Sequence, residues 1–289
     1  MVLVALFEGL SIGATYALVG LGLVLAFRTT GVLSFVHGQL MLLGVFLIGS
    51  WQARGFGVFS VQLILALLVV SAICMAFYWL VLRYADGLPP FVGFMATLGL
   101  ASILDAVLLW FFGSASYRLN VPGVPDGVWD ILGSRISSGT LVVSLVSIAL
   151  AVLVAFFVQG TEIGVRMRAG GQNPVLAAQS GIRIRPLFLA AWALTGILAV
   201  LAGVAFASTR LATLDMTQLM LAAFPAIFLG GLDSTWGAIV GGLGIGMLQG
   251  FTLSVVGGDY SDVVTWLALL IVMLFLPHGL FGTRNSVRV

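Results

Sequence analysis

Long apolar runs dominate this sequence of 289 residues and constrain what the chain can fold into. Hydrophobic residues make up 61% of it and charged residues 8%, whereas an ordinary soluble domain is roughly 25% charged. A membrane-spanning helix needs about 20 mostly apolar residues. Cutting the chain at its charged or Gly/Pro-rich breaks gives nine such segments: 3–27, 31–50, 59–82, 91–112, 140–159, 187–208, 217–232, 236–256 and 262–277. The sequence therefore predicts an all-α polytopic membrane protein, folded as a single transmembrane domain over residues 1–289.

The seventh segment, 217–232, differs from the other eight. It is short, contains Pro225 and ends in Gly230-Gly231. Proline inside a helix removes a backbone hydrogen bond and bends or ends the helix. This composition favours a re-entrant helix, so we expect eight or nine membrane segments.

Arginine sets the expected orientation, because basic residues in short loops stay on the cytoplasmic side. The densest basic cluster lies within residues 160–186, at Arg166, Arg168, Arg183 and Arg185. We therefore expect 160–186 to be cytoplasmic and, by alternation, 113–139 to be an external loop. The same alternation places Arg284 and Arg288 on the cytoplasmic side only if the chain crosses nine times, which favours nine crossings over eight.

The sequence lacks the residues for several kinds of chemistry. It contains no lysine, which excludes a P-loop and a Schiff-base lysine in this chain. Its one cysteine, Cys74, has no disulfide partner and is expected to fill packing space. Histidine occurs only as His37 and His278 and glutamate only as Glu8 and Glu162, too few for a zinc or di-iron site. We predict no cofactor, no metal, no catalytic residues and no nucleic-acid partner.

Small residues recur at helical spacing in two places. One series is Gly9, Gly13 and Ala17, and the other is Gly237, Gly241 and Ile245. Small residues let helix backbones approach closely in membranes. We interpret both series as packing seams and assign them no function.

The basic segment 160–186 contains a short helix with signals at both of its ends. Asn173 is a good N-cap, Pro174 suits the first helical position, and Gly181 suits the position after the helix. The predicted helix, 174–180, is only about two turns long and would be marginal alone in water. It is either an element that docks on a partner or part of a solvated connector, and local features leave both open.

Polar residues interrupt the second apolar segment. Ser34 and His37 lie three positions apart, and Gln39 follows Gly38. If the helix breaks near Gly38, its freed backbone groups could face a polar substrate, as in the discontinuous helices of transporters. The alternative is an interfacial histidine that is hydrogen-bonded to a neighbouring carbonyl.

Asp105 lies well inside the fourth apolar segment. A carboxylate in the membrane costs about 2.5–3.5 kcal/mol on insertion scales. We therefore expect Asp105 to face a cavity, to be paired or to be protonated. A hydrogen-bonded contact between helices is the alternative to a functional role.

Six stretches follow the motifs of one known family, in order along the chain. They are 9–18 (GLSIGATYAL), 34–38 (SFVHG), 96–100 (ATLGL), 164–174 (GVRMRAGGQNP) with Ala177 and Gly181-Ile182, 230–238 (GGLDSTWGA) and 277–282 (PHGLFG). With them the chain resembles the branched-chain amino acid permeases of ABC transporters, the LivH/LivM type.

The resemblance implies an ABC importer permease fold and a role in carrying branched-chain amino acids, or a related small polar solute such as urea or a short amide, into the cell. It also implies the partners: two ATPase subunits, a second permease chain that is identical or related, an extracytoplasmic substrate-binding protein and the bacterial inner membrane. ATP hydrolysis would then be carried out by the partner chains.

The resemblance also assigns expected roles to residues. The translocation pathway would include Ser34, His37, Gly38, Gln39, Thr97 and Asp105. Contact with the ATPases would involve the coupling loop 160–186, at Arg166, Arg168, Asn173, Pro174, Ala177 and Gly181. A gate hairpin would include Pro225, Gly230, Gly231 and Asp233.

One position departs from the pattern of this superfamily. Its permeases often carry a Glu-Ala-Ala-x-x-x-Gly signature, and counting back from Gly181 gives Val175, Leu176 and Ala177 in place of Glu-Ala-Ala. A charge contact from that position to an ATPase is therefore not expected. Docking would depend on shape, on apolar contact and on the flanking arginines.

Two other functions are compatible with an apolar chain. A channel or secondary transporter working alone would need coupling-ion sites, for which Asp105 is the only fair candidate, and would leave the capped helix at 174–180 unexplained. An intramembrane hydrolase could use Ser34 with His37. However, a nucleophile elbow and an orienting acid are both missing nearby.

Overall fold

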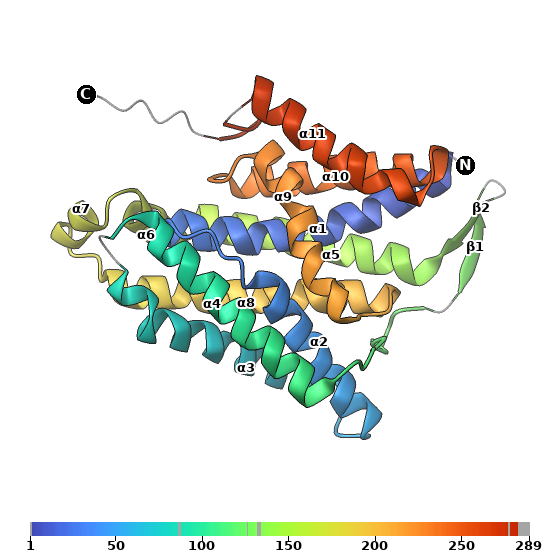
Figure 1. The fold of residues 1–289 in the computed structure, drawn as a ribbon, viewed down its shortest axis with the longest axis horizontal. Coiled ribbons are helices and arrows are strands. Elements are labelled where there is room, and N and C mark those ends of the chain that lie inside the picture. The colour runs from blue at the N-terminus through green and yellow to red at the C-terminus, as the bar shows by residue number, and fades with distance from the viewer. Residues whose placement is uncertain (1, 86–87, 126, 132–133, 277, 283–289) are drawn as a thin grey trace. The chain divides into compact units, whose positions relative to one another are not determined.

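The computed structural model describes residues 2–85, 88–125, 127–131, 134–276 and 278–282. Helices make up most of this part of the chain (Figure 1). The α-helices are α1 (Val2–Thr30), α2 (His37–Ala53), α3 (Phe59–Leu80), α4 (Pro90–Phe112), α5 (Ser138–Gly160), α6 (Glu162–Gln172), α7 (Pro174–Gln179), α8 (Ile184–Thr209), α9 (Leu219–Gly230), α10 (Thr235–Val255) and α11 (Ser261–Phe275). The 3₁₀ helices are η1 (Leu82–Tyr84), η2 (Leu214–Gln218) and η3 (Gly258–Tyr260).

Each of the nine predicted apolar segments contains a helix. Six helices among the described residues are long and apolar enough to cross a membrane: Val4–Thr30, Phe59–Tyr84, Phe91–Phe112, Ser138–Gly160, Ile184–Thr209 and Thr235–Val255. In a bilayer such segments must satisfy their backbone groups internally, which a helix does. The helices α2, α9 and α11 are shorter, so the expected eight or nine crossings and the re-entrant helix stay predictions.

The described residues fall into two compact units. The first unit combines residues within Met1–Val24, Pro125–Ala155 and Ala222–Val289, and the second combines Leu25–Val124 with Phe156–Leu221. The expectation of one permease domain stays a prediction.

In the second unit, α8 packs against both α2 and α3. Between α3 and α8, the hydroxyl of Ser71 donates to the carbonyl of Ala193 at 3.2 Å. Cys74 is buried beside Gly196, where an added Cβ would lie 2.9 Å from the Cys74 sulfur. The cysteine thus fills packing space, as the sequence predicts.

In the first unit, α10 packs against α1 and α11, and Figure 1 shows α10 and α11 running side by side. A Cβ added to Gly246 would lie 2.2 Å from the Cα of Gly13, and one added to Gly9 would lie 3.0 Å from the Gly246 carbonyl. The first predicted packing seam is confirmed, with glycines of α10 as its partner. Gly237 and Gly241 of the second series approach the backbone of α9 just as closely.

The segment 113–139 contains a short antiparallel hairpin that the sequence did not indicate. Its strands are β1 (Val128–Ile131) and β2 (Ser134–Ser137). Within the second unit, Tyr117 exchanges two backbone hydrogen bonds with Ala212, so the start of this segment is tied to the end of α8. Its external location stays a prediction.

Candidate functional site

A non-helical stretch, residues 31–36, separates α1 from α2. Gly31 ends α1: its N–H donates to the Phe27 carbonyl at 2.8 Å, and its φ of 69° lies in the left-handed region that glycine adopts most easily. The sequence suggested a break near Gly38, and the non-helical stretch ends two residues before it. The chain becomes helical again at His37, so Ser34 lies inside the break and His37 at its edge.

The sequence suggested that Gly38 makes the helix flexible, but the structure gives this glycine a different role. It lies in the first turn of α2, where an added Cβ would be 2.5 Å from the carbonyl oxygen of Thr217 in η2. Glycine is therefore required for a close backbone contact. The sequence could not reveal this, because the two residues are far apart along the chain.

Ser34 and His37 are buried without hydrogen-bond partners. Both have 0% of their surface exposed, and within the described part of the chain the Ser34 hydroxyl and both His37 ring nitrogens lack a partner. The alternative, a histidine hydrogen-bonded to a neighbouring carbonyl, is therefore not what the described residues show for His37. A buried polar group left unsatisfied costs about 1–3 kcal/mol. Such groups are suited to binding a polar ligand that supplies the missing bonds.

Thr97 of α4 holds the break in place. Its hydroxyl lies 2.8 Å from the Phe94 carbonyl and 3.3 Å from the Leu33 carbonyl, and it accepts a hydrogen bond from the Phe35 N–H at 3.3 Å. The rings of Phe35 and Phe94 also meet edge to face at 4.8 Å. Thr97 therefore bonds to the backbone on both sides of Ser34, and the expected pathway stays a prediction.

Gln39 and Asp105 connect α2 with α4. The Gln39 amide donates to an oxygen of Asp105 at 3.2 Å, and Asp105 is exposed in the isolated chain. Asp105 is therefore hydrogen-bonded between helices, which is the structural alternative that the sequence left open. We use the name polar break for residues 31–39 together with Thr97 and Asp105. A role of the polar break in translocation stays a prediction.

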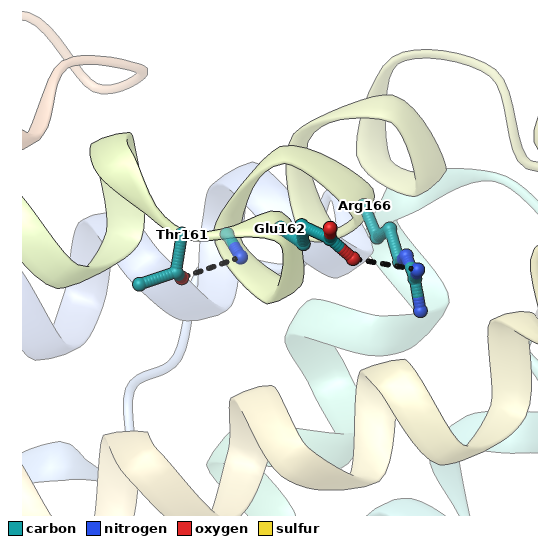
Figure 2. Close-up of polar contacts among 4 residues, drawn as sticks. Thr161, Glu162 and Arg166 are labelled. Carbon is teal, nitrogen blue, oxygen red and sulfur yellow. Dashed lines mark hydrogen bonds and ion pairs between the residues drawn. The ribbon is translucent and has the colours of Figure 1, made fainter.

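The predicted coupling loop, 160–186, contains α6, a helix that the sequence did not indicate. Figure 2 shows its first turn: the hydroxyl of Thr161 accepts from the Gly164 N–H at 3.2 Å, and Glu162 pairs with Arg166 at 2.9 Å. A threonine N-cap followed by an acid and a base four residues apart is a helix-start signal. Three glycines in the stretch 164–171 obscured that signal, since glycine is a poor helix former.

The short helix predicted at 174–180 is present as α7. The Asn173 side chain accepts from the Leu176 N–H at 3.0 Å, Pro174 occupies the first turn, and Gly181 has a φ of 83° after the helix. Ala177 is buried, whereas Val175 is 66% and Leu176 59% exposed. The helix thus presents two apolar side chains outward.

The two arginines of α6 differ in their surroundings. Arg166 is exposed and paired with Glu162, and it lines an open hollow of about 570 Å³ together with Gly181 and Arg183. Arg168 is half-buried, and its guanidinium donates to the carbonyls of Val158 at 2.8 Å and Gln159 at 3.2 Å. Arg168 therefore caps the end of α5, and a contact between Arg168 and an ATPase stays a prediction.

The hairpin between α9 and α10 is built on close glycine contacts. Pro225 is buried inside α9, and a Cβ on Gly230 would lie 1.9 Å from the Gly237 carbonyl. Gly231 turns the chain with a φ of 105°. Asp233 is half-buried in this turn. The gate role assigned to this hairpin stays a prediction.

The end of the described chain returns to this hairpin. The N–H groups of Leu280 and Phe281 donate to the carbonyls of Leu229 and Gly230 at 2.8 and 3.0 Å. Pro277 of the motif 277–282 lies outside the described residues, as do Arg284 and Arg288, which were expected on the cytoplasmic side.

Comparison with known proteins identifies one family. The family model described as the permease component of the branched-chain amino acid transport system matches residues 5–274. The high-affinity branched-chain amino acid permease protein LivH of Escherichia coli is 23% identical, with 98% of this chain and 96% of LivH covered. BraD of Pseudomonas aeruginosa, with the same description, is 28% identical over 98% of this chain and 97% of BraD.

More distant matches extend to other solutes. The guanosine ABC transporter permease protein NupQ of Bacillus subtilis is 28% identical, over 59% of this chain and 54% of NupQ. Among solved structures, PsaBC from Streptococcus pneumoniae in complex with Fab aligns with 95% of this chain at 14% identity and a TM-score of 0.48.

Proposed function

The chain belongs to the family of branched-chain amino acid transport permeases and is a multi-pass membrane protein, and from this premise we propose that it is the permease subunit of an ABC importer. Its cargo is a branched-chain amino acid or a related small polar solute, moved inward by ATP hydrolysis on separate subunits. The relatives LivH and BraD, which are named for branched-chain amino acids and match over nearly their full length, support this cargo. The relative NupQ is named for guanosine, and it supports including other small polar solutes in the proposal.

The exposed helix α7 is the observation that carries the proposal. It is capped at both ends, yet it leaves Val175 and Leu176 largely uncovered. A helix of six residues is too short to be stable alone. A partner surface that covers Val175 and Leu176 would explain why this helix forms and why it exposes two apolar side chains. The chain has no lysine for a P-loop, and energy must therefore arrive through a contact of this kind.

The hollow beside α7 supplies the electrostatic part of the same docking surface. Arg166 and Arg183 line it with Gly181. Arg183 and the ion-paired Arg166 at an open concavity favour a polar partner surface. Together, α7 and this hollow form a docking area for an ATPase on each permease chain, and a pair of permease chains would engage two ATPase subunits.

The polar break is the proposed place of substrate passage. Ser34 and His37 offer a hydroxyl and two ring nitrogens with no partner in the described chain. A polar solute from the extracytoplasmic binding protein would supply the missing hydrogen bonds as it crosses the inner membrane. The bonds between Thr97 and residues 33–35 keep these groups at a defined position.

The proposal is tested by reconstituting this permease with its ATPases and its binding protein in liposomes and measuring uptake. We expect uptake to require ATP. Leu176→Asp should break the co-purification of the ATPase and stop uptake, because it places a charge in an apolar contact. Leu211→Asp is a matched control: Leu211 is 56% exposed and lies just beyond the other end of α8, so it should leave both measurements unchanged.

Uptake that continues without any ATPase would contradict the proposal. It would favour the channel or secondary transporter that the sequence also allowed.

A further inference from the structure

The helix α6 is fixed directly to the end of α5. A Cβ added to Gly164 would lie 1.9 Å from the carbonyl oxygen of Val158, so the two backbones are in contact. The Arg168 guanidinium adds hydrogen bonds to the carbonyls of Val158 and Gln159. These contacts leave little freedom for the start of α6 to move independently of the end of α5.

The other end of α6 meets the end of α1. A Cβ added to Gly171 would lie 1.9 Å from the carbonyl oxygen of Arg28 and 3.2 Å from the Cα of Thr29. Any side chain at Gly171 would force these backbones apart. The neighbouring Gly170 is different, because its added Cβ would meet only side chains, at 3.2 Å or more.

The end of α1 continues directly into the polar break. Gly31 has a left-handed backbone and open space around it, with nothing within 4 Å of an added Cβ. Three residues later, Ser34 is buried without a partner. Only residues 30–33 lie between Thr29 and Ser34, and one of them, Gly31, has open space around it.

Space for a displacement of the end of α1 exists beside α7. A cavity of about 470 Å³ is lined by Thr29, Thr30 and Gly31 from the end of α1 and by Pro174 and Val175 from α7. The first turn of α7 and the end of α1 thus line the same cavity. The close backbone contact with the end of α1 is made by Gly171 of α6.

We propose that α6 transmits movement of α7 to the end of α1, with Gly171 as the positioning residue at the contact and Gly31 as the point about which the polar break is displaced. This inference rests on the proposed function, since it describes how ATPase docking at α7 would open or close the substrate passage. It assigns roles to Gly171 and to the end of α1 in addition to those of the docking helix.

The test compares two neighbouring glycines of the same helix in the complete transporter. Gly171→Ala and Gly170→Ala raise helix propensity equally, but only the first forces two backbones apart. For Gly171→Ala we expect uptake to fall by about tenfold, within the range for residues that carry coupling, while assembly and ATP hydrolysis persist. For Gly170→Ala we expect all three measurements to match the wild type.

Equal uptake by the two variants, with an active wild type, would overturn the inference and leave the proposed function intact. Joint loss of assembly, hydrolysis and uptake in a folded Gly171→Ala complex would also overturn it, because α6 would then serve docking alone. A wild type that shows no ATP-driven uptake would instead contradict the proposed function.

A second measurement leaves α6 unchanged and covers the case in which Gly171→Ala does not fold. Thr30→Cys places a thiol on the wall of the shared cavity, in a chain whose buried Cys74 is replaced by alanine. We expect the rate of its labelling by a small maleimide to change when ATP is trapped on the ATPases. A rate that is independent of nucleotide would overturn the inference.

Discussion

Two regions of this molecule bury polar side chains, and they do so in opposite ways. In the first unit, the Tyr16 hydroxyl donates to the Gln249 side chain at 2.9 Å, and the Gln249 amide donates to Thr265 at 2.8 Å. In the polar break of the second unit, Ser34 and His37 are equally buried but have no partner in the described chain.

The difference separates a scaffold from the proposed binding region. Hydrogen bonds between membrane helices contribute about 1 kcal/mol each to holding them together, and the Tyr16–Gln249–Thr265 chain has this role. Unsatisfied groups destabilise the protein alone and become favourable only when a ligand completes them. Changes in the first unit should therefore alter stability, and changes in the polar break should alter transport.

The largest expected effect comes from the scaffold. Gly246→Val should destabilise the protein by about 3 kcal/mol or more, because the new side chain would overlap the backbone of Gly13. The measurement is the thermal unfolding midpoint of the purified protein. Gly244→Val is the control, since an added Cβ there meets only a Leu229 side-chain atom at 3.5 Å. Equal midpoints for the two variants would show that the contact between Gly246 and Gly13 does not hold the first unit together.

The next largest effect is expected for His37→Leu, which should lower transport without lowering stability. His37→Leu removes two unsatisfied nitrogens, so we expect an unfolding midpoint equal to or above that of the wild type and uptake lower by about tenfold, from the loss of hydrogen bonds to the solute. Trp192→Phe is the control, because its indole nitrogen is also buried without a partner but lies outside the polar break. A destabilised His37→Leu protein would show that His37 belongs to the scaffold.

A smaller effect is expected when the Tyr16–Gln249–Thr265 chain is broken. Gln249→Leu should lower the free energy of unfolding by about 1 kcal/mol, because Tyr16 and Thr265 lose their common partner. Uptake per folded molecule should stay at the wild-type level. The exposed Gln218 serves as the control, since Gln218→Leu breaks no such bridge. A specific loss of uptake with unchanged stability would contradict the scaffold role.

The sequence predicted the features that depend on local signals. The apolar segments and the capped helix α7 followed from hydropathy and from Asn173, Pro174 and Gly181. The features it missed depend on contacts between distant residues. Gly38 is glycine because of Thr217, and the partner of Gln39 is Asp105. The glycines of α6 hid that helix, and Gly171 is explained only by the end of α1.

One residue, Asn173, belongs to two helices at once. Its backbone N–H donates to the Ala169 carbonyl and ends α6, while its side chain accepts from Leu176 and begins α7. No linker residues besides Asn173 therefore separate α6 from α7, and a displacement of one helix moves the other. One residue inserted into α6 would rotate α7 by about 100° about the axis of α6. The length of α6 thus fixes the direction in which α7, the proposed docking helix, presents Val175 and Leu176.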